Sequence, residues 1–425
     1  MTFPLQANKI NGCAGWQEGA SRDAPDTETG LTNRSGLFAA AFLAAVALAA
    51  SCQSTLDKAG PFDNAKSLPA LSPNPNGETV GTGTVRIALL LPRTSAGNAA
   101  AVSNELRNGA LLAMTDTGQG AIQLVIKDTG GQTAGAQAAA NEAVLEGAVA
   151  VLGPVFASDV SAASAITAPA GRTMLAFSTD ASVARRGIYL LSYLPQDDTQ
   201  RIIDFAVSQG KRSFLAFLPN NAEGQLREAA LRQSAGAAGA NATILRYDRN
   251  PQSLDKIVAD ATPLLGGVDS LYIPEGNEIP NVILQGFRRK GVKTFGKLVI
   301  GSGAWETVKI GEAVLEGAIY PGRDLANFAA FQSRYEATYG ARPGVWAGIG
   351  YDAVTLAANL ARGGNPLETF RPEIIENPRG YAGVNGVFRL RANGTAERGL
   401  AVYQVRNGKA EVISPAPATF SRTGS

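Results

Sequence analysis

The strongest constraint on the fold is a regular alternation of short apolar runs and helical segments between residues 85 and 300. The runs VRIALLL at 85–91, IQLVIKD at 122–128 and SFLAFL at 213–218 have the length of buried strands. Each is followed by a segment of helical composition, and the series occurs twice, before and after Pro195. It predicts an α/β fold with two lobes, each a mostly parallel sheet flanked by helices, because parallel strands need crossover helices.

Composition excludes several classes of function. The chain has 425 residues, and 45% of them are hydrophobic, which is enough for two sizeable cores. Its net charge of +2 gives no electrostatic footprint for nucleic acid, so we expect no nucleic-acid partner. The chain has no histidine and only two cysteines, Cys13 and Cys52, which excludes histidine triads and His- or Cys-rich metal sites. We expect no enzyme, because no acid, base and nucleophile stand together, and no metal or cofactor.

The N-terminal segment has the features of an export signal. Arg34 precedes 14 apolar residues at 37–50, a run too short for a typical spanning helix but typical of a signal peptide. The small residues before Cys52 resemble a bacterial lipobox, which implies that Cys52 is the lipidated first residue of the mature chain. The alternative is an ordinary signal peptide with a chance cysteine. We predict an N-terminal extension and signal peptide at 1–51, and a flexible Pro- and Gly-rich tether at 52–83.

A candidate binding loop follows the apolar run at 149–152. Gly153-Pro154 ends this run, and Ser158 and Asp159 stand where a helix N-cap belongs. Free backbone N–H groups and the helix dipole would hold a ligand carboxylate there without a basic side chain. Every strand-to-helix turn has such N–H groups, so a purely structural turn is the alternative.

The order of these segments resembles that of the type I periplasmic binding proteins, in particular the Leu/Ile/Val-binding branch. The segments that carry the resemblance are VRIALLLP at 85–92, NGALLAM at 108–114, VLGPVFASDVSAA at 151–163 and FQSRYEATYGARPGVWAGIGYDAVTLAANL at 331–360. The resemblance implies two lobes joined by three hinge crossings, near 192–195, 320–324 and 382–386. Lobe one would comprise 84–194 plus 324–383, lobe two 195–322 plus 384–413, and 414–425 would be a disordered tail.

The resemblance also implies a ligand site in the cleft between the lobes. From lobe one it points to Phe156, Ala157, Ser158, Asp159, Ser178, Thr179 and Asp180, where family members bind an α-carboxylate and an α-amine. From lobe two it points to Asn221, Ala222, Glu223, Glu275, Glu278, Ser302 and Trp305.

The lobe-two residues depart from the family pattern in two places. Ala222 stands where the family often has an aromatic residue, and the usual acidic residue near Gly303 is missing, although Glu306 lies close. Glu275, Glu278 or Asp180 could still pair with a ligand ammonium. As alternatives, Asp180 caps the next helical turn and Glu278 starts the next helix.

Two functions follow from the resemblance. The first is a lipid-anchored periplasmic solute-binding protein that captures an amino acid or similar small molecule for an ABC permease. The second is a regulatory lipoprotein of the penicillin-binding protein activator type, which contacts a peptidoglycan synthase; the tether and Ala222 favour it. Both place the chain in the periplasm, anchored to the cell envelope membrane through Cys52, and Gln53 favours the outer membrane.

Two further motifs have structural explanations. Ser253-Leu254-Asp255-Lys256 matches the S-x-x-K of penicillin-recognising enzymes, but no K-T-G follows, and Ser253 suits an N-cap. The segment GVKTFGK at 291–297 is one residue short of a phosphate loop and precedes a strand instead of following one. We interpret Arg288-Arg289-Lys290 as a solvated helix end favoured by the helix dipole.

Overall fold

The structure is a computed structural model that describes residues 70–420. The predicted signal peptide, Cys13, Cys52 and most of the predicted tether lie outside the described residues. Within residues 70–420, no helix is both long and apolar enough to cross a membrane.

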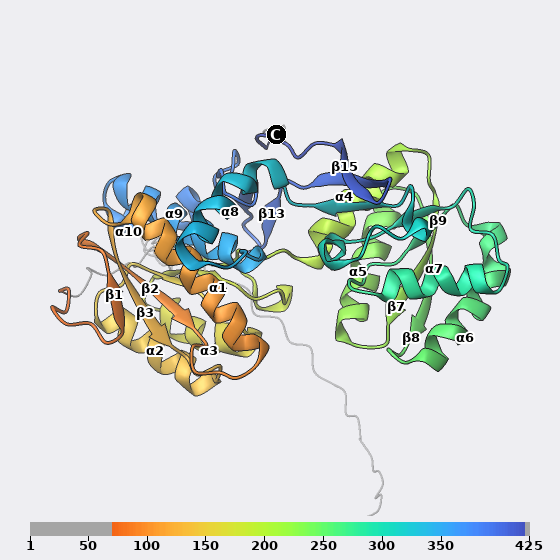
Figure 1. Ribbon diagram of the computed structural model, residues 1–425. Helices are drawn as coiled ribbons and strands as arrows, with labels where there is room; N and C mark the ends of the chain where they lie inside the picture. The colour runs from red at the N-terminus through yellow and green to blue at the C-terminus, as the bar shows by residue number, and fades with distance from the viewer. Residues whose placement is uncertain (1–69, 421–425) are drawn as a thin grey trace, which may run out of the picture. The chain divides into compact units, whose positions relative to one another are not determined.

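The first sheet has six strands in the order β1-β3-β2-β4-β5-β6 (Figure 1). The strands are β1 Glu78–Val80, β2 Val85–Leu91, β3 Ile122–Asp128, β4 Ala150–Leu152, β5 Thr173–Ala176 and β6 Ile188–Leu190. Strands β2 to β6 are parallel, and β1 pairs antiparallel with β3 at the edge. Strand β1 falls within the segment predicted as a flexible tether, so the ordered body begins before residue 84.

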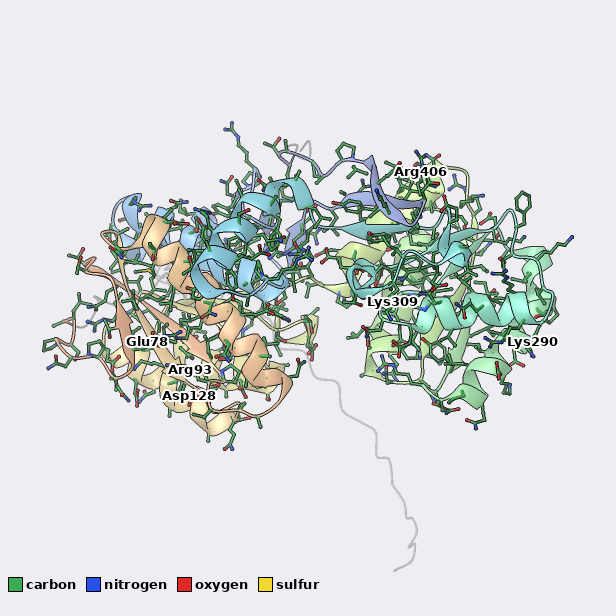
Figure 2. All side chains as sticks on the ribbon, in the orientation of Figure 1. Glu78, Arg93, Asp128, Lys290, Lys309 and Arg406 are labelled. Atoms are coloured by element: carbon green, nitrogen blue, oxygen red, sulfur yellow. The ribbon has the colours of Figure 1, made fainter. Side chains whose placement is uncertain are left out.

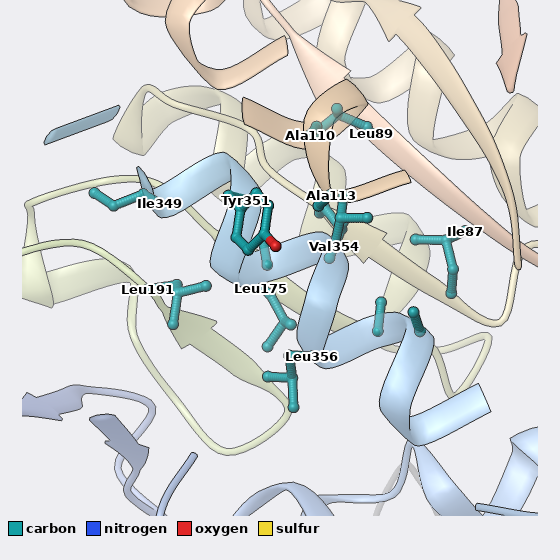
Figure 3. Close-up of a cluster of buried hydrophobic side chains, with 14 of the residues drawn as sticks. Ile87, Leu89, Ala110, Ala113, Leu175, Leu191, Ile349, Tyr351, Val354 and Leu356 are labelled. Atoms are coloured by element: carbon teal, nitrogen blue, oxygen red, sulfur yellow. The ribbon is translucent and has the colours of Figure 1, made fainter. Parts of the chain in front are cut away.

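Helices cover both faces of the first sheet. One face packs against α1 Asn98–Ala113, α8 Leu325–Tyr339 and α9 Val345–Arg362, and the buried cluster there includes Leu89, Ala110 and Val354 (Figure 3). The other face packs against α2 Thr133–Leu145 and α3 Ala157–Thr167 through small side chains such as Ala140 and Ala163. These two helical layers explain why β2 is buried along its whole length.

Helices α1 and α9 approach each other at glycines. A Cβ atom on Gly109 would lie 1.8 Å from the backbone oxygen of Ala347, and one on Gly350 would lie 2.2 Å from that of Leu106. Any side chain at these two positions would therefore push the helices apart.

The second sheet has seven strands in the order β15-β14-β11-β10-β9-β7-β8. The strands are β7 Ser213–Pro219, β8 Asn241–Tyr247, β9 Ser270–Tyr272, β10 Leu298–Ile300, β11 Ile319–Gly322, β14 Ala401–Arg406 and β15 Lys409–Ser414. The first five are parallel, and β14 and β15 are antiparallel additions. The helices that cover it are α4 Pro195–Ser208, α5 Ala222–Ala237, α6 Pro251–Ala261 and α7 Ile279–Arg289. The predicted fold class, two mostly parallel sheets flanked by helices, is confirmed.

The third hinge crossing, predicted near 382–386, lies later in the chain. The hairpin β12 Phe388–Leu390 and β13 Ala396–Arg398 contributes Phe388, Leu390 and Ala396 to the core of the first sheet. The backbone N–H of Leu190 donates to the oxygen of Gly394 at 2.8 Å, so the hairpin extends that sheet beyond β6. We therefore place this hairpin in lobe one, and lobe two resumes near Leu400 instead of 384.

Several helices begin earlier than the sequence suggested. Helix α3 begins at Ala157 with Phe156 as its N-cap, so Ser158 and Asp159 lie inside its first turn. Helix α6 begins at Pro251 and its N-cap is Asn250, which accepts a hydrogen bond from the Ser253 backbone; Ser253 itself is not the cap. Proline at the first helical position fits because that N–H has no helical partner.

The remaining segments are short. The segment after α9 forms two single turns, α10 Pro366–Thr369 and α11 Pro372–Ile375, since Pro372 cannot continue a helix. A π turn at Met114–Gly118 follows α1, and 3₁₀ turns occur at Ala181–Val183, Thr262–Gly267, Gly303–Thr307 and Ala313–Leu315.

Candidate functional site

A pocket of about 470 Å³ lies at the C-terminal edge of the first sheet, where the loops after β4 and β5 meet the starts of α1 and α9. Its lining residues are Asn98, Ala99, Val102, Val155, Phe156, Ala157, Phe177, Ser178, Thr179, Asp180 and Trp346. Open α/β sheets bind ligands at this edge because parallel strands and helix N-termini converge there. The lining combines three aromatic rings with a few polar groups, which suits a small and partly apolar ligand.

Two helices present free backbone donors at this pocket. The first backbone bond of α3 runs from Val160 N to Phe156 O, which leaves the N–H of Ala157 and its two successors without a helical partner. Helix α1 begins in the same way, with Asn98 and Ala99 in the lining. No lysine or arginine lines the pocket. The helix dipoles and these N–H groups are therefore its anion-attracting elements.

The start of the third helix, α9, already faces a carboxylate, that of Glu105 on α1. The Glu105 side chain lies against Gly344, where a Cβ would be 2.4 Å from Oε2. Burial raises the pKa of Glu105, and the backbone N–H groups of Ala347 and Trp346 oppose this rise. The Glu105 carboxylate thus partly neutralises the positive end of the α9 dipole within the lobe. The contribution of α9 to the pocket is the Trp346 ring.

The structure brings together most of the residues predicted from lobe one. Phe156, Ala157, Ser178, Thr179 and Asp180 all line the pocket. Asp180 Oδ1 accepts a hydrogen bond from Ser182 N at 2.9 Å, so the prediction that Asp180 caps the following turn is confirmed.

Ser158 and Asp159 do not line this pocket. Ser158 is exposed, and its hydroxyl donates to Asp159 Oδ1 at 3.3 Å. Asp159 is buried, and burial raises its pKa. Its carboxylate therefore lies beneath the start of α3 and not on the pocket surface.

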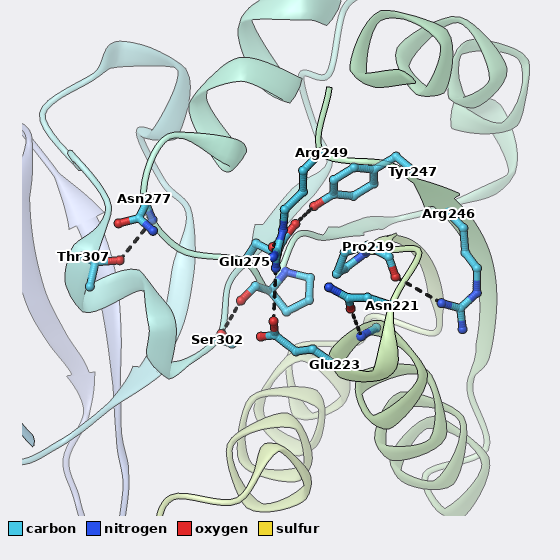
Figure 4. A network of polar contacts seen from close by, with 12 residues as sticks. Pro219, Asn221, Glu223, Arg246, Tyr247, Arg249, Glu275, Asn277, Ser302 and Thr307 are labelled. Carbon is cyan, nitrogen blue, oxygen red and sulfur yellow. Dashed lines mark hydrogen bonds and ion pairs between the residues drawn. The ribbon is translucent and has the colours of Figure 1, made fainter. Parts of the chain in front are cut away.

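In lobe two, the candidate Glu275 is part of a closed polar network (Figure 4). Glu275 is buried, and its carboxylate accepts hydrogen bonds from the Tyr247 hydroxyl and, at 2.7 Å, from Arg249 Nε. Arg249 Nη2 also lies 3.1 Å from Glu223 Oε2. Burial and the Glu275 carboxylate raise the pKa of Tyr247, which stays a hydrogen-bond donor. Two predicted acidic residues thus share one arginine.

Three other lobe-two candidates, Asn221, Ala222 and Glu278, lie at the N-terminal ends of helices. Asn221 is the N-cap of α5 and accepts from Gly224 N at 3.0 Å, while Ala222 is the first residue of that helix and not part of a loop. Glu278 is the N-cap of α7 with an exposed side chain, so the prediction that it starts this helix is confirmed.

Ser302 and Trp305 are buried inside the loop after β10. The Ser302 hydroxyl donates to Pro274 O and accepts from Ala304 N, and Trp305 Nε1 donates to Ile273 O at 2.8 Å. The Trp305 ring packs against Tyr320. These contacts stabilise the loop and leave both polar groups bonded within lobe two.

The acidic residue nearest the family position is also paired. Glu306 accepts from Arg323 Nη2 at 2.7 Å, and Arg323 Nη1 donates to Asn385 Oδ1 at 3.2 Å. Arg249 and Arg323 were not predicted, because each lies far in sequence from the carboxylate that it meets. Trp346 was also missed, although it stands in the GVWAG segment used for the resemblance. Among residues 70–420, no group of His, Cys, Asp and Glu could hold a metal ion.

Comparison with known proteins agrees with the two-sheet fold. Residues 84–410 match the sequence model of a family described as periplasmic binding protein. A putative branched-chain amino acid ABC transporter from Rhodospirillum rubrum has a TM-score of 0.68 and 21% identity over 77% of this chain and 99% of its own. A leucine binding protein from Thermotoga maritima has a TM-score of 0.56 and 20% identity over 78% and 98%.

A third similar structure has a different ligand. The solute binding protein of an ABC transporter from R. palustris, in complex with benzoate, has a TM-score of 0.55 and 18% identity over 79% of this chain and 98% of its own. No curated protein matches the sequence. The family match covers most of the chain, and the chain therefore belongs to the periplasmic binding protein family.

Proposed function

We propose that the chain is an exported solute-binding protein that captures a small organic carboxylate and delivers it to an ABC transporter. The observation that carries this proposal is the lobe-one pocket, which pairs unbonded helix N-termini with the rings of Phe156, Phe177 and Trp346. Similar proteins were solved with leucine and with benzoate. Both ligands have a carboxylate and an apolar body, the two features that this pocket complements.

The carboxylate is the essential part of this ligand, and an ammonium group is optional. Glu275 and Glu306 are each paired with an arginine, so neither offers a free negative charge to an amine. An amino acid ligand would have to place its ammonium near Asp180, which lines the pocket, or near the exposed Glu278. Amino acids and simple carboxylic acids therefore both belong in the ligand panel.

A thermal-shift and calorimetry screen tests the proposal. The protein from residue Gln53 onward would be unfolded and refolded to remove bound ligand, then mixed with leucine, benzoate and their primary amides, which lack the carboxylate charge. A ligand at 100 times its Kd should add about 2.7 kcal/mol to the free energy of unfolding. We expect the acids to bind and the amides not to, because only a carboxylate is stabilised by the N-terminus of α3. Equal binding of acids and amides would contradict the proposed site.

A proline substitution tests the backbone donor directly. Ala157 is the first residue of α3, and the preceding Phe156 has an extended backbone, so Ala157→Pro removes one N–H while the helix is kept. Losing a hydrogen bond to a charged group costs about 1.5–3 kcal/mol, which predicts roughly a tenfold or greater loss of affinity. Thr133→Pro, at the same position of α2 after the extended Gln132, is the matched control and should bind normally, because Thr133 does not line the pocket.

We propose further that Cys52 is lipidated and that the protein works in the periplasm, tethered to the envelope membrane. The support is the lipobox-like sequence around Cys52. Metabolic labelling with a fatty acid should mark the wild type and not Cys52→Ser. Labelling of both proteins, or of neither, would contradict lipidation at this residue.

A second candidate function is regulatory contact with a peptidoglycan synthase. The closed Arg249 network and the methyl group of Ala222 favour it, since they leave lobe two few free groups for a small ligand. This candidate predicts a flat ligand panel and a synthase recovered in pull-downs with the tethered body. A clear shift with one ligand class would exclude a purely regulatory role.

A further inference from the structure

The loop between α7 and β10 carries an unusually exposed aromatic ring. Phe295 is 96% exposed, more than any other large apolar side chain in residues 70–420. Gly291 and Gly296 bound the loop with φ angles of 68° and 82°, a conformation that favours glycine. The backbone is thus folded in a way that holds Phe295 out in solvent.

The same segment is strongly basic. From Arg288 to Lys297 it contains five lysines and arginines and no acidic residue. Arg288, Lys290 and Lys293 are exposed, and no described carboxylate lies within ion-pair distance of them. Figure 2 labels Lys290 at the end of α7. The helix dipole accounts for cations within the last turn of α7, but it does not account for Lys293 or Phe295 beyond that turn.

A small pocket of about 360 Å³ lies at the base of this loop. Its apolar lining comes from Leu284, Val292 and Val314, and Arg288 and Lys293 supply positive charge beside Phe295. An apolar floor with a cationic rim matches a molecule that is both anionic and partly apolar. Neither the solute pocket nor the Arg249 network includes any of these residues.

We propose that this basic–aromatic loop, residues 288–297, binds the surface of an anionic lipid bilayer. Phe295 would enter the headgroup region, and Arg288, Lys290 and Lys293 would contact lipid phosphates. An aromatic ring among flexible cations is suited to this boundary, where apolar burial and attraction to anionic lipid act together. A protein partner would require a larger apolar patch than one ring.

The position of the loop in the fold keeps it clear of the solute-binding edge. It precedes β10, whereas the loops that contain Glu275 and Ser302 follow β9 and β10. These two strands are parallel, so the basic–aromatic loop lies at the opposite edge of the second sheet. Lipid binding there leaves the candidate ligand loops accessible, and the proposal stands whether or not the solute proposal holds.

Vesicle co-sedimentation tests the proposal. The body from Gln53, which contains both described cores and lacks the apolar run at 37–50, would be mixed with phosphatidylcholine vesicles with and without phosphatidylglycerol. We expect binding only with phosphatidylglycerol, and less binding as salt increases. Each cation near an anionic surface is worth about 1 kcal/mol, so Lys290→Gln with Lys293→Gln should weaken binding roughly thirtyfold.

Matched controls separate the loop from general surface effects. Phe295→Ser should weaken binding roughly tenfold, by analogy with partial burial of an aromatic side chain. Leu145→Ser removes another exposed apolar side chain, and Lys309→Gln with Lys409→Gln removes two exposed lysines elsewhere; both should bind as the wild type does. Circular dichroism melting verifies that each variant is folded.

Three results would overturn the proposal. Equal binding to vesicles with and without phosphatidylglycerol would remove the anionic requirement. Equal losses in the control variants would show that position does not matter. Binding to single-stranded DNA that survives Phe295→Ser, without vesicle binding, would assign the loop to a general polyanion and not to lipid.

Discussion

A buried ion pair in lobe two is expected to control the stability of the loop after β10. The Arg227 and Asp198 side chains are 8% and 10% exposed and join α5 to α4. Asp198 Oδ1 accepts from Arg227 Nη1, and Oδ2 accepts from Gly303 N at 3.1 Å. The carboxylate therefore fixes the start of the loop that contains Trp305, and Arg227 provides its compensating charge.

Arg227→Met removes that charge while keeping most of the aliphatic stem. The Asp198 carboxylate then remains buried with only the neutral donors Gly303 N and Thr199 Oγ1, the latter at 3.3 Å. Breaking a buried pair by removing one partner costs about 3–5 kcal/mol. The double variant Asp198→Leu with Arg227→Met removes both charges and leaves only the Gly303 N–H unpaired, a cost of about 1–3 kcal/mol. We expect the double variant to be more stable than the single one.

Equilibrium unfolding in urea at pH 7 measures these differences. Arg232→Met in the same helix is the control, because Arg232 is 55% exposed in its pair with Glu228 and its loss should cost less than about 1 kcal/mol. Hydrogen exchange at Gly303 reports the loop itself and should accelerate in Arg227→Met. A cost below about 1 kcal/mol for Arg227→Met, or a double variant less stable than the single, would refute this reasoning.

Two further predictions concern stability. Burial raises the pKa of Asp197 to about 7 from 3.8, although Arg391 opposes the rise, so its stabilising contribution is complete below about pH 4 and is lost as pH rises through 7. The stability of the wild type relative to Asp197→Asn should fall by about 1.4 kcal/mol per pH unit across that window, measured by urea unfolding at several pH values; a constant difference would contradict it. Gly109→Ala should destabilise by more than about 2 kcal/mol through its clash with Ala347, whereas Gly236→Ala in the exposed last turn of α5 should stabilise by up to about 1 kcal/mol. Thermal melting compares the two, and equal melting temperatures would show that the helices can separate freely.

The strands that could be predicted from the sequence are the buried ones that consist of a continuous run of apolar residues. Strand β2 has the bounds predicted from VRIALLL, and β3 those predicted from IQLVIKD. Strand β11, IYPG, was missed because proline and glycine argue against a strand, yet Pro321 pairs with Val402 inside the sheet. Strand β1, ETV, has no apolar run and is held by pairing with β3.

The position of the candidate site could be predicted from the sequence, but the ion pairs and contacts around it could not. Parallel topology puts the loops after β4 and β5 at one edge, which is why Phe156 and Ser178 both reach the pocket. No spacing rule pairs Arg249 with Glu275 or brings Trp346 to the pocket that Phe156 also lines, since both arrangements depend on how whole elements pack. The sequence therefore located the carboxylates and could not show which of them were already neutralised.

The packing of α8 and α9 against α1 affects the order of folding. The Tyr339 hydroxyl bonds to the backbone of Asn108, 231 residues earlier, so lobe one is closed by a segment made long after its first strands. Strands β7 to β11 of lobe two arrive as one continuous stretch. During synthesis or export from the N-terminus, lobe two can assemble most of its sheet before α8 and α9 are available to cover the apolar face of β2. Such long-range closure is slow, and the half-built first sheet is the stage most exposed to aggregation.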